Sequence, residues 1–435
     1  MKKILTLLLA CLLLAGCAET ATTESTETQQ TTQTETEPVS ELTAEQEKLL
    51  QERRDTAESY MRDMATVLWR ATVDVVWTTD STLVTEEDLA AYCEEKDPMV
   101  IRAGRLYQGV PYSYSGAAAG NFYAFFNGED EKGYPTASGL HWRNLNGSST
   151  TGVSRVGNDC SGAVQLAWES VGGNVTRVST AHMTQAYGYL PVGDYETEVL
   201  EYVDTPAITE KNGGEVMFAA YAQLQKADAV VRRADGAGHT MMVVDVHVEY
   251  TSGGAIDGMN SYITVLHQTS SYLKKEAYAY DETIGEDVYQ TFGVDDKYTF
   301  LKLLGSGYLP ITCDVLVDSE ATPLEPWFKD SETEYTKDNI FTGKFTSNAM
   351  IARVTVTVTD ADGQEVGKKI CFGRRQSNME EAFFELNWFE TEEEFNLLGQ
   401  LGLENLTPGT YHCTHVLTDA HGGEHVMRDF DFTVE

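Results

Sequence analysis

Basic residues are scarce in this chain. Its 435 residues include 31 Lys and Arg against 68 Asp and Glu, and the formal net charge is −37 at pH 7. Proteins that bind nucleic acid, or that lie against anionic lipid through charge alone, need clustered Lys and Arg. The composition therefore argues against a nucleic-acid partner, and any attachment to a membrane must come from something other than charge.

Apolar runs long enough to cross a bilayer, which takes about 20 residues, are also lacking. A shorter apolar run at residues 4–14 follows two lysines, the pattern of a signal peptide. It leads into Leu14-Ala15-Gly16-Cys17, which resembles the bacterial lipobox, where the cysteine is acylated and becomes the mature N-terminus. We therefore predict a signal peptide at 1–16, a lipid on Cys17, and a protein anchored to the outer face of the bacterial cell membrane.

Aromatic residues are absent from 18–40, where the chain is almost entirely Thr, Glu, Gln, Ser and Ala. Such a segment buries too little apolar surface to offset the conformational entropy lost on folding. Residues 17–40 are thus predicted to be a lipidated cysteine followed by a disordered tether.

Cysteines are few, and none has the paired spacing of a zinc site. Beyond the signal peptide and Cys17, five remain: Cys93, Cys160, Cys313, Cys371 and Cys413. An odd number in an exported protein leaves at least one thiol free. Cys160 is our candidate, and the sequence leaves open whether Cys371 and Cys413 pair.

Residues 41–97 have the pattern of a helical segment. Thr43 and Gln46 fit a capping box, and a second short helix is expected after Thr85. Apolar residues recur at helical spacing at Met61, Met64, Leu68, Ala71 and Val75. We interpret this stripe as core packing.

Residues 98–317 have the pattern of a mixed α+β domain. We expect a helix leading into Tyr107, a helix that begins at Cys160, and strands at 240–248 and 262–267. Pro323 and Pro326 mark the end of this region.

Residues 323–435 are predicted to form a β-sandwich. Apolar and polar residues alternate around Val354, Val356 and Val358, and again around Phe430 and Phe432. The sequence 406–411 resembles the start of a strand in an immunoglobulin-like sandwich. His412 and His415 are interpreted as ordinary surface residues rather than as metal ligands.

The densest chemical signal surrounds Cys160, in Gly157-Asn158-Asp159-Cys160-Ser161-Gly162. The apolar periodicity that follows places this cysteine at the N-terminus of a helix. Partial positive charge at a helix N-terminus stabilises a thiolate, so we expect a lowered thiol pKa and a nucleophilic sulfur. A buried structural cysteine is the alternative for the motif alone.

Further motifs accompany this cysteine in a fixed order. They are the loop 107–116 with Val110-Pro111-Tyr112, the sequence Ala227-Asp228, a strand opening at Gly238-His239, and a later strand ending at His267. In this order they resemble the NlpC family of papain-like cell-wall cysteine peptidases, over roughly half of the chain.

The resemblance implies a role for each matching residue. Cys160 would be the nucleophile, His239 its base, and His267 the third residue that orients the base; Gln268, on the opposite face of the strand, is the alternative to His267. The residues implied to line the substrate site are Tyr112, Asp159, Ser161, Arg177 and Ser179.

The same resemblance implies the reaction. It is hydrolysis of peptidoglycan stem peptides, or of soluble muropeptides, at the γ-D-glutamyl–diamino acid bond through a thioester, without a metal or an organic cofactor. The open alternatives are an N-acetylmuramoyl-L-alanine amidase, a cross-bridge endopeptidase, and a non-catalytic surface-binding lipoprotein. Inserts at 117–158 and 190–223, and Ala227 where the family has glycine, depart from the family pattern.

Overall fold

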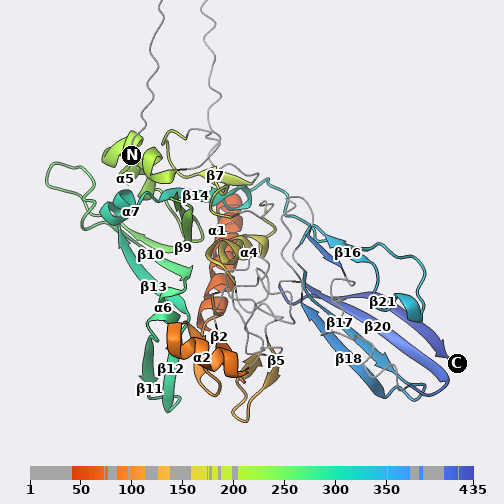
Figure 1. Cartoon of the computed structure of the whole chain (residues 1–435). Helices are drawn as coiled ribbons and strands as arrows, with labels where there is room; N and C mark the ends of the chain where they lie inside the picture. Colours follow the sequence, from red (N-terminus) through yellow and green to blue (C-terminus); the bar gives the residue numbers. More distant parts are fainter. Residues whose placement is uncertain are drawn as a thin grey trace, which may run out of the picture. The chain divides into compact units, whose positions relative to one another are not determined.

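The computed structural model of the protein has a mixed α+β fold (Figure 1). It describes residues 42–72, 74–76, 86–96, 98–112, 126–137, 158–173, 175, 179–184, 188–197, 204–349, 351–372, 382–385, 406–419 and 421–435. The predicted signal peptide, Cys17, the tether and Arg177 lie outside these residues. No helix in this described part of the chain is long and apolar enough to cross a membrane.

The first helix, α1 (Ala44–Thr66), begins as predicted. Thr43 Oγ1 accepts a hydrogen bond from the Gln46 amide at 3.2 Å, and Gln46 Oε1 accepts one from the Thr43 amide at 2.8 Å. This reciprocal pair is the capping box, and it satisfies donors that a helix start leaves open. Met61 and Met64 are fully buried and share a core with the helix α4 (Cys160–Glu169) and the sheet on which α4 packs.

The prediction that 41–97 is helical is only partly right. The helix α2 (Glu86–Lys96) confirms the second helix, but β1 (Leu68–Arg70) and β2 (Val75–Val76) are strands. Likewise β4 (Leu106–Gln108) replaces the helix expected before Tyr107. β1 pairs with β4, which stacks Trp69 on Tyr107 with ring centroids 5.1 Å apart. This tertiary pairing outweighs the helical spacing, because propensity is a weak determinant where a buried sheet can form.

β1 and β4 belong to a sheet with the order β11-β12-β4-β1-β6-β5. Its remaining members are β5 (Phe126–Glu129), β6 (Pro135–Ala137), β11 (Tyr278–Asp281) and β12 (Glu286–Gln290), and β2 pairs separately with β3 (Val100–Ile101).

A second sheet, β13-β10-β9-β8-β14-β7, is antiparallel throughout and carries the candidate site. Two of its strands confirm the expected strands at 240–248 and 262–267: β9 (Ala237–His247) and β10 (Tyr262–Gln268). The others are β7 (Tyr189–Pro191), β8 (Ala229–Ala234), β13 (Phe292–Thr299) and β14 (Leu309–Cys313). The associated helices are α5 (Thr205–Tyr221), α6 (Ser271–Lys274), α7 (Phe300–Ser306) and η1 (Asp314–Leu316).

The C-terminal part is made of two sheets around a separate apolar core. Val354, Val356 and Val358 are fully buried on β17 (Ile351–Thr359), which confirms the predicted alternation. One sheet is β15 (Phe328–Asp330), β16 (Lys344–Ser347) and β19 (Ala382–Glu385), with η2 (Lys337–Asn339) between β15 and β16. The other is β17 with β18 (Glu365–Phe372), β20 (Gly409–Asp419) and β21 (Glu424–Val434).

One sequence interpretation of this part is revised. His415 is buried, not at the surface, because residues 412 and 415 face opposite sides of β20; its Nε2 bonds to the Ile340 carbonyl at 2.6 Å. Within the described residues, no group of three His, Cys, Asp or Glu side chains could hold a metal ion. Cys413 is free and buried, and the side chain of Cys371 lies outside the described part of the structure.

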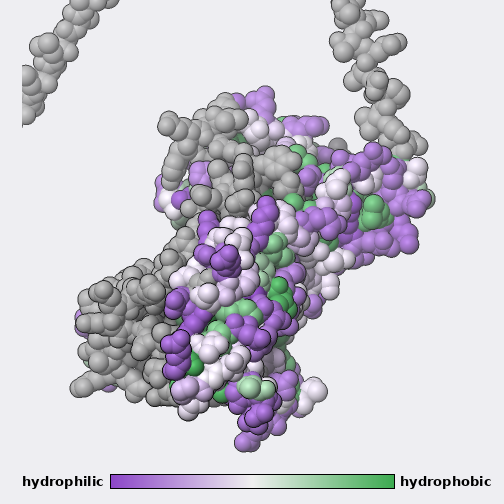
Figure 2. All heavy atoms as spheres, turned by 90° about the vertical axis from the view of Figure 1, so that its right-hand side faces the viewer, coloured by the Kyte–Doolittle hydropathy of each residue, from purple (hydrophilic) through white to green (hydrophobic). Residues whose placement is uncertain are grey.

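The visible face in Figure 2 is mostly hydrophilic where it is coloured, with hydrophobic residues scattered over it. Exposed large apolar residues such as Tyr250, Met259 and Val426 occur singly in the sequence. Scattered apolar residues are normal on the surface of a folded protein.

Candidate active site

Cys160 is the first residue of α4, as the sequence predicts. Asp159 caps the helix: its Oδ1 accepts hydrogen bonds from the Gly162 amide at 2.6 Å and the Ser161 hydroxyl at 2.8 Å. Asp159 and Ser161, expected to line the substrate site, therefore have a structural role in fixing the start of the helix.

The segment Val110-Pro111-Tyr112, called the Pro-Tyr loop below, lies next to this helix start. Tyr112 forms an isolated bridge with Asn158, and the Asn158 amide donates to the Pro111 carbonyl at 3.0 Å. The segment at Pro111 and Tyr112 is thus held against Asn158, which precedes the candidate nucleophile by two positions.

The ionisation of Cys160 differs from the prediction. Burial raises the pKa of the Cys160 thiol to about 12, and the Asp159 carboxylate adds to the shift. Backbone N–H groups of Thr240, Ser161 and Cys160 act in the opposite direction but do not outweigh burial. Only 5% of the residue's surface is exposed. The helix N-terminus therefore stabilises negative charge here without making the resting group a thiolate.

His239 and His267 form a direct pair of imidazoles. His239 Nε2 and His267 Nδ1 are 2.8 Å apart, from adjacent strands β9 and β10. Thr240, which follows His239, presents its amide to the Cys160 sulfur. No hydrogen bond joins that sulfur to an imidazole among the described residues, and His239 Nδ1 has no hydrogen-bond partner among them either. Of the two ring nitrogens of His239, Nδ1 is therefore the one that His267 does not contact.

Burial also sets the charge of the base. It lowers the pKa of His239 to about 3, and positive charge on Arg232, and on His267 when that ring is protonated, adds to the shift. A neutral imidazole can accept a proton, whereas a cationic one cannot. The resting pair is thus a neutral thiol and a neutral base.

His267 and Gln268, the two alternatives for the orienting residue, differ in what they contact. His267 contacts His239, whereas Gln268 faces the other way and is fully buried. Gln268 Nε2 donates to the Val110 carbonyl at 2.7 Å and so ties the Pro-Tyr loop to β10. Its Oε1 has no hydrogen-bond partner.

Two residues that the sequence did not single out complete the arrangement. His267 Nε2 lies 2.8 Å from Asp296 Oδ2, and the Tyr272 hydroxyl donates to the same oxygen at 2.7 Å. Gly293 makes room: a side chain at this position would collide with the His267 ring. In the sequence, Asp296 is visible only as half of the pair Asp295-Asp296 in a strand. Which of the two faces His267 cannot be read without the register of β13 against β10.

The other implied substrate residues are placed less directly. Ser179 is half-buried, and its neighbour Thr180 fills the space that a side chain at Gly238 would need. The segment that follows α4 therefore packs against the residue preceding His239. Arg177 and most of the insert 117–158 lie outside the described residues, whereas the insert 190–223 contains α5.

The departure at Ala227 has a visible structural consequence. Ala227 adopts a left-handed conformation (φ 68°), which L-residues other than glycine rarely adopt. The next residue, Asp228, is only 1% exposed and forms an ion pair with Arg54 of α1 at 2.8 Å. Burial raises the pKa of Asp228, and the Arg54 charge opposes that shift.

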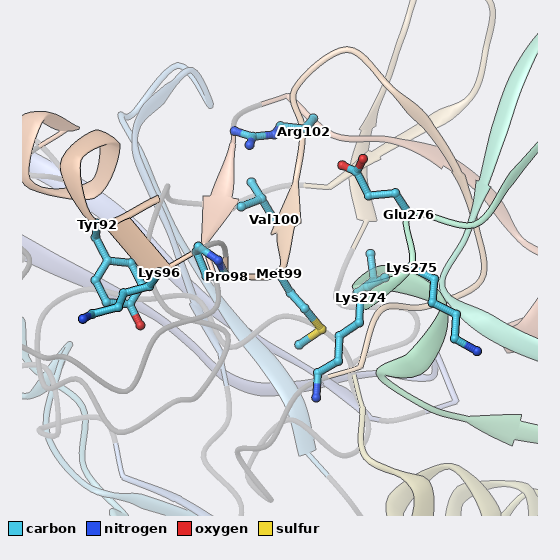
Figure 3. A pocket seen from close by; sticks show the side chains of 10 residues that line it. Tyr92, Lys96, Pro98, Met99, Val100, Arg102, Lys274, Lys275 and Glu276 are labelled. Atoms are coloured by element: carbon cyan, nitrogen blue, oxygen red, sulfur yellow. The ribbon is translucent and has the colours of Figure 1, made fainter. Parts of the chain in front are cut away.

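A cavity of about 820 Å³ lies elsewhere, between α2, β3 and the end of α6 (Figure 3). Its lining includes Lys96, Arg102, Lys274 and Lys275 but neither Cys160 nor a histidine. Arg102 is neutralised by Asp74 at 2.9 Å. The lining therefore lacks a nucleophile–base pair.

Comparison with known proteins gives no match: neither a protein-family model nor a curated protein matches this chain. A function can therefore be inferred only from the motifs and from the geometry around Cys160.

Proposed function

We propose that this protein is a cysteine peptidase that hydrolyses peptidoglycan stem peptides, with Cys160 as nucleophile and His239 as base. The observation that carries the proposal is the pair formed by His239 and His267 beside the N-terminus of the Cys160 helix. A nucleophile, a base and a group that orients the base are the parts that covalent hydrolysis of an amide requires.

We also propose that the domain carrying Cys160 is papain-like and that the C-terminal part is an immunoglobulin-like sandwich. An α-helix that begins at the nucleophile and packs against an antiparallel sheet carrying the base supports a papain-like domain. In the C-terminal part, the Tyr411 hydroxyl donates to the Thr407 carbonyl at 2.9 Å, a tie back to the preceding chain that supports an immunoglobulin-like sandwich.

The reaction follows from two neutral groups. As the sulfur attacks the scissile carbonyl carbon, the thiol proton passes to His239 Nδ1, so no resting thiolate is needed. When the tetrahedral intermediate collapses, the C–N bond breaks, the leaving amine takes that proton, and the acyl group remains on Cys160 as a thioester. His239 then deprotonates a water molecule that hydrolyses the thioester, which releases a carboxylic acid and regenerates the thiol.

The bond is assigned by the family resemblance. We propose L-Ala-γ-D-Glu as the acyl donor and the diamino acid as the leaving amine. An N-acetylmuramoyl-L-alanine amidase or a cross-bridge endopeptidase would use the same sulfur on another bond. A non-catalytic surface-binding lipoprotein would have no use for the histidine pair. Mass spectrometry of muropeptides after digestion separates all four.

Location is proposed from the sequence alone. Cys17 and the tether would hold the peptidase at the outer face of the membrane through a lipid. Metabolic labelling with a fatty-acid analogue tests this, and a protein that takes up no label would refute it.

Replacing His267 should reduce turnover far more than replacing Gln268. His267→Ala removes the group that orients His239, so kcat should fall by roughly 10²–10³-fold with little change in KM, because the lost interaction serves the transition state. Gln268→Ala should act mainly on stability, by about 1–2 kcal/mol, because the buried Val110 carbonyl loses its donor. Steady-state kinetics and denaturant unfolding of both variants measure this. If Gln268→Ala lost more kcat than His267→Ala, the orienting residue would lie on the other face of β10, and the assignment to His267 would be wrong.

A further inference from the structure

We infer that Asp296, held by Tyr272, is a positioning residue that fixes which ring nitrogens of His239 and His267 carry protons. This inference rests on the proposed function, because it concerns how the base is prepared. It goes beyond that function by adding two residues to a site of Cys160, His239 and His267.

A bulge in β13 places Asp296. In the pairing with β10, His267 lies opposite Gly293 and Val265 lies opposite Asp296. Two residues of β13 therefore lie between these partners where β10 has only one. Residues three apart on a regular strand face opposite sides, whereas the extra residue puts Gly293 and Asp296 on one side. Asp295 takes up the irregularity with a positive φ of 55°. The bulge thus brings a carboxylate to the ring for which Gly293 leaves room.

The contacts of Asp296 fix its charge. It accepts hydrogen bonds from His267 Nε2 and, at both oxygens, from the Tyr272 hydroxyl at 2.7 and 2.9 Å. The hydrogen bond from His267 holds the pKa of Asp296 below its usual value, and the Tyr272 hydrogen bond adds to this effect. Asp296 is therefore a carboxylate at neutral pH and can only accept.

Proton positions then follow along the chain of contacts. Because Asp296 only accepts, His267 must carry a proton on Nε2. Whenever His267 is neutral, its Nδ1 is bare and accepts from His239 across the 2.8 Å contact, so His239 then carries its proton on Nε2. His239 Nδ1 is left unprotonated and able to take the thiol proton. The opposite tautomer of His239 would be unable to act as the base.

Asp296 differs from its neighbour in what it contacts. Asp295 pairs with Arg62 at 3.1 Å and is largely exposed, the kind of ion pair that contributes little to stability. Asp296 instead contacts a ring that is 4% exposed and that touches the base. The adjacent aspartates therefore provide a matched pair for experiment.

The test compares Asp296→Asn with Asp295→Asn. Asp296→Asn keeps the size of the side chain but can present an N–H to His267 and so reverse the tautomers. We expect kcat to fall about 10-fold to 100-fold with KM within about twofold of the wild type. Tyr272→Phe should lower kcat by about threefold, and Asp295→Asn should leave it unchanged.

A readout independent of activity is ¹⁵N NMR of histidine-labelled protein. In the wild type, both His239 and His267 should show a protonated Nε2 and an unprotonated Nδ1; this pattern should change in Asp296→Asn and persist in Asp295→Asn. An Asp296→Asn variant with the wild-type ¹⁵N pattern and wild-type kcat would overturn the inference. If instead the wild-type activity does not depend on Cys160, the proposed function fails, while the ¹⁵N pattern still decides the proton positions.

Discussion

The Cys160→Ala variant is expected to lose stem-peptide hydrolysis by at least about 10⁴-fold, because the acyl group has no other atom to which it can be transferred. The Cys160 sulfur lies at the first position of α4 and receives the backbone amide of Thr240, the residue that follows His239. Turnover of a defined muropeptide, followed by chromatography, measures the loss.

The control is a second buried cysteine. Cys313 is fully buried on β14, and burial raises the pKa of its thiol above the ordinary range, so it resembles Cys160 in burial, but it does not lie at the start of α4. Cys313→Ala should keep wild-type turnover at a cost in stability from the lost packing. Equal activity of Cys160→Ala and Cys313→Ala would remove the catalytic assignment.

The Arg54→Met variant is expected to lose about 3–5 kcal/mol of unfolding free energy. Arg54 and Asp228 are 4% and 1% exposed, and removing the cation leaves a buried carboxylate without its charge partner. Arg54 also donates to the Lys226 carbonyl at 2.7 Å, so α1 is held to the turn before β8 at two points.

A neighbouring exposed pair supplies the control. Lys226 and Asp55 join the same two segments at 2.9 Å, but both side chains are more than a third exposed. Lys226→Met should therefore change stability by less than about 1 kcal/mol. Denaturant unfolding of both variants measures the difference, and similar losses would mean that the buried pair adds nothing beyond a surface contact.

Sequence patterns predicted the parts of the fold that depend on neighbouring residues. The capping box at Thr43, the helix start at Cys160 and the alternation around Val356 all appear in the structure, because each is decided within one turn or one strand. The strand at Trp69 was missed, because its pairing with β4 depends on residues about 40 positions away.

The candidate site was predictable only in part for the same reason. Motif order identified Cys160, His239 and His267, and the last two lie in contact. Asp296 was not predictable, because its place beside His267 depends on a bulge in the register of two strands. The thiol pKa was predicted in the wrong direction, since the helix N-terminus is visible in the sequence and burial is not.

The most direct test of the central claim is mass spectrometry of muropeptides digested in parallel by the wild type and by Cys160→Ala. Both intact sacculi and defined soluble muropeptides should be digested, because the inserts leave the accepted substrate size open. The wild type alone should release disaccharide-L-Ala-D-Glu and leave a new free amine on the diamino acid. Cleavage between the lactyl group and L-Ala, or identical products from the two proteins, would contradict it.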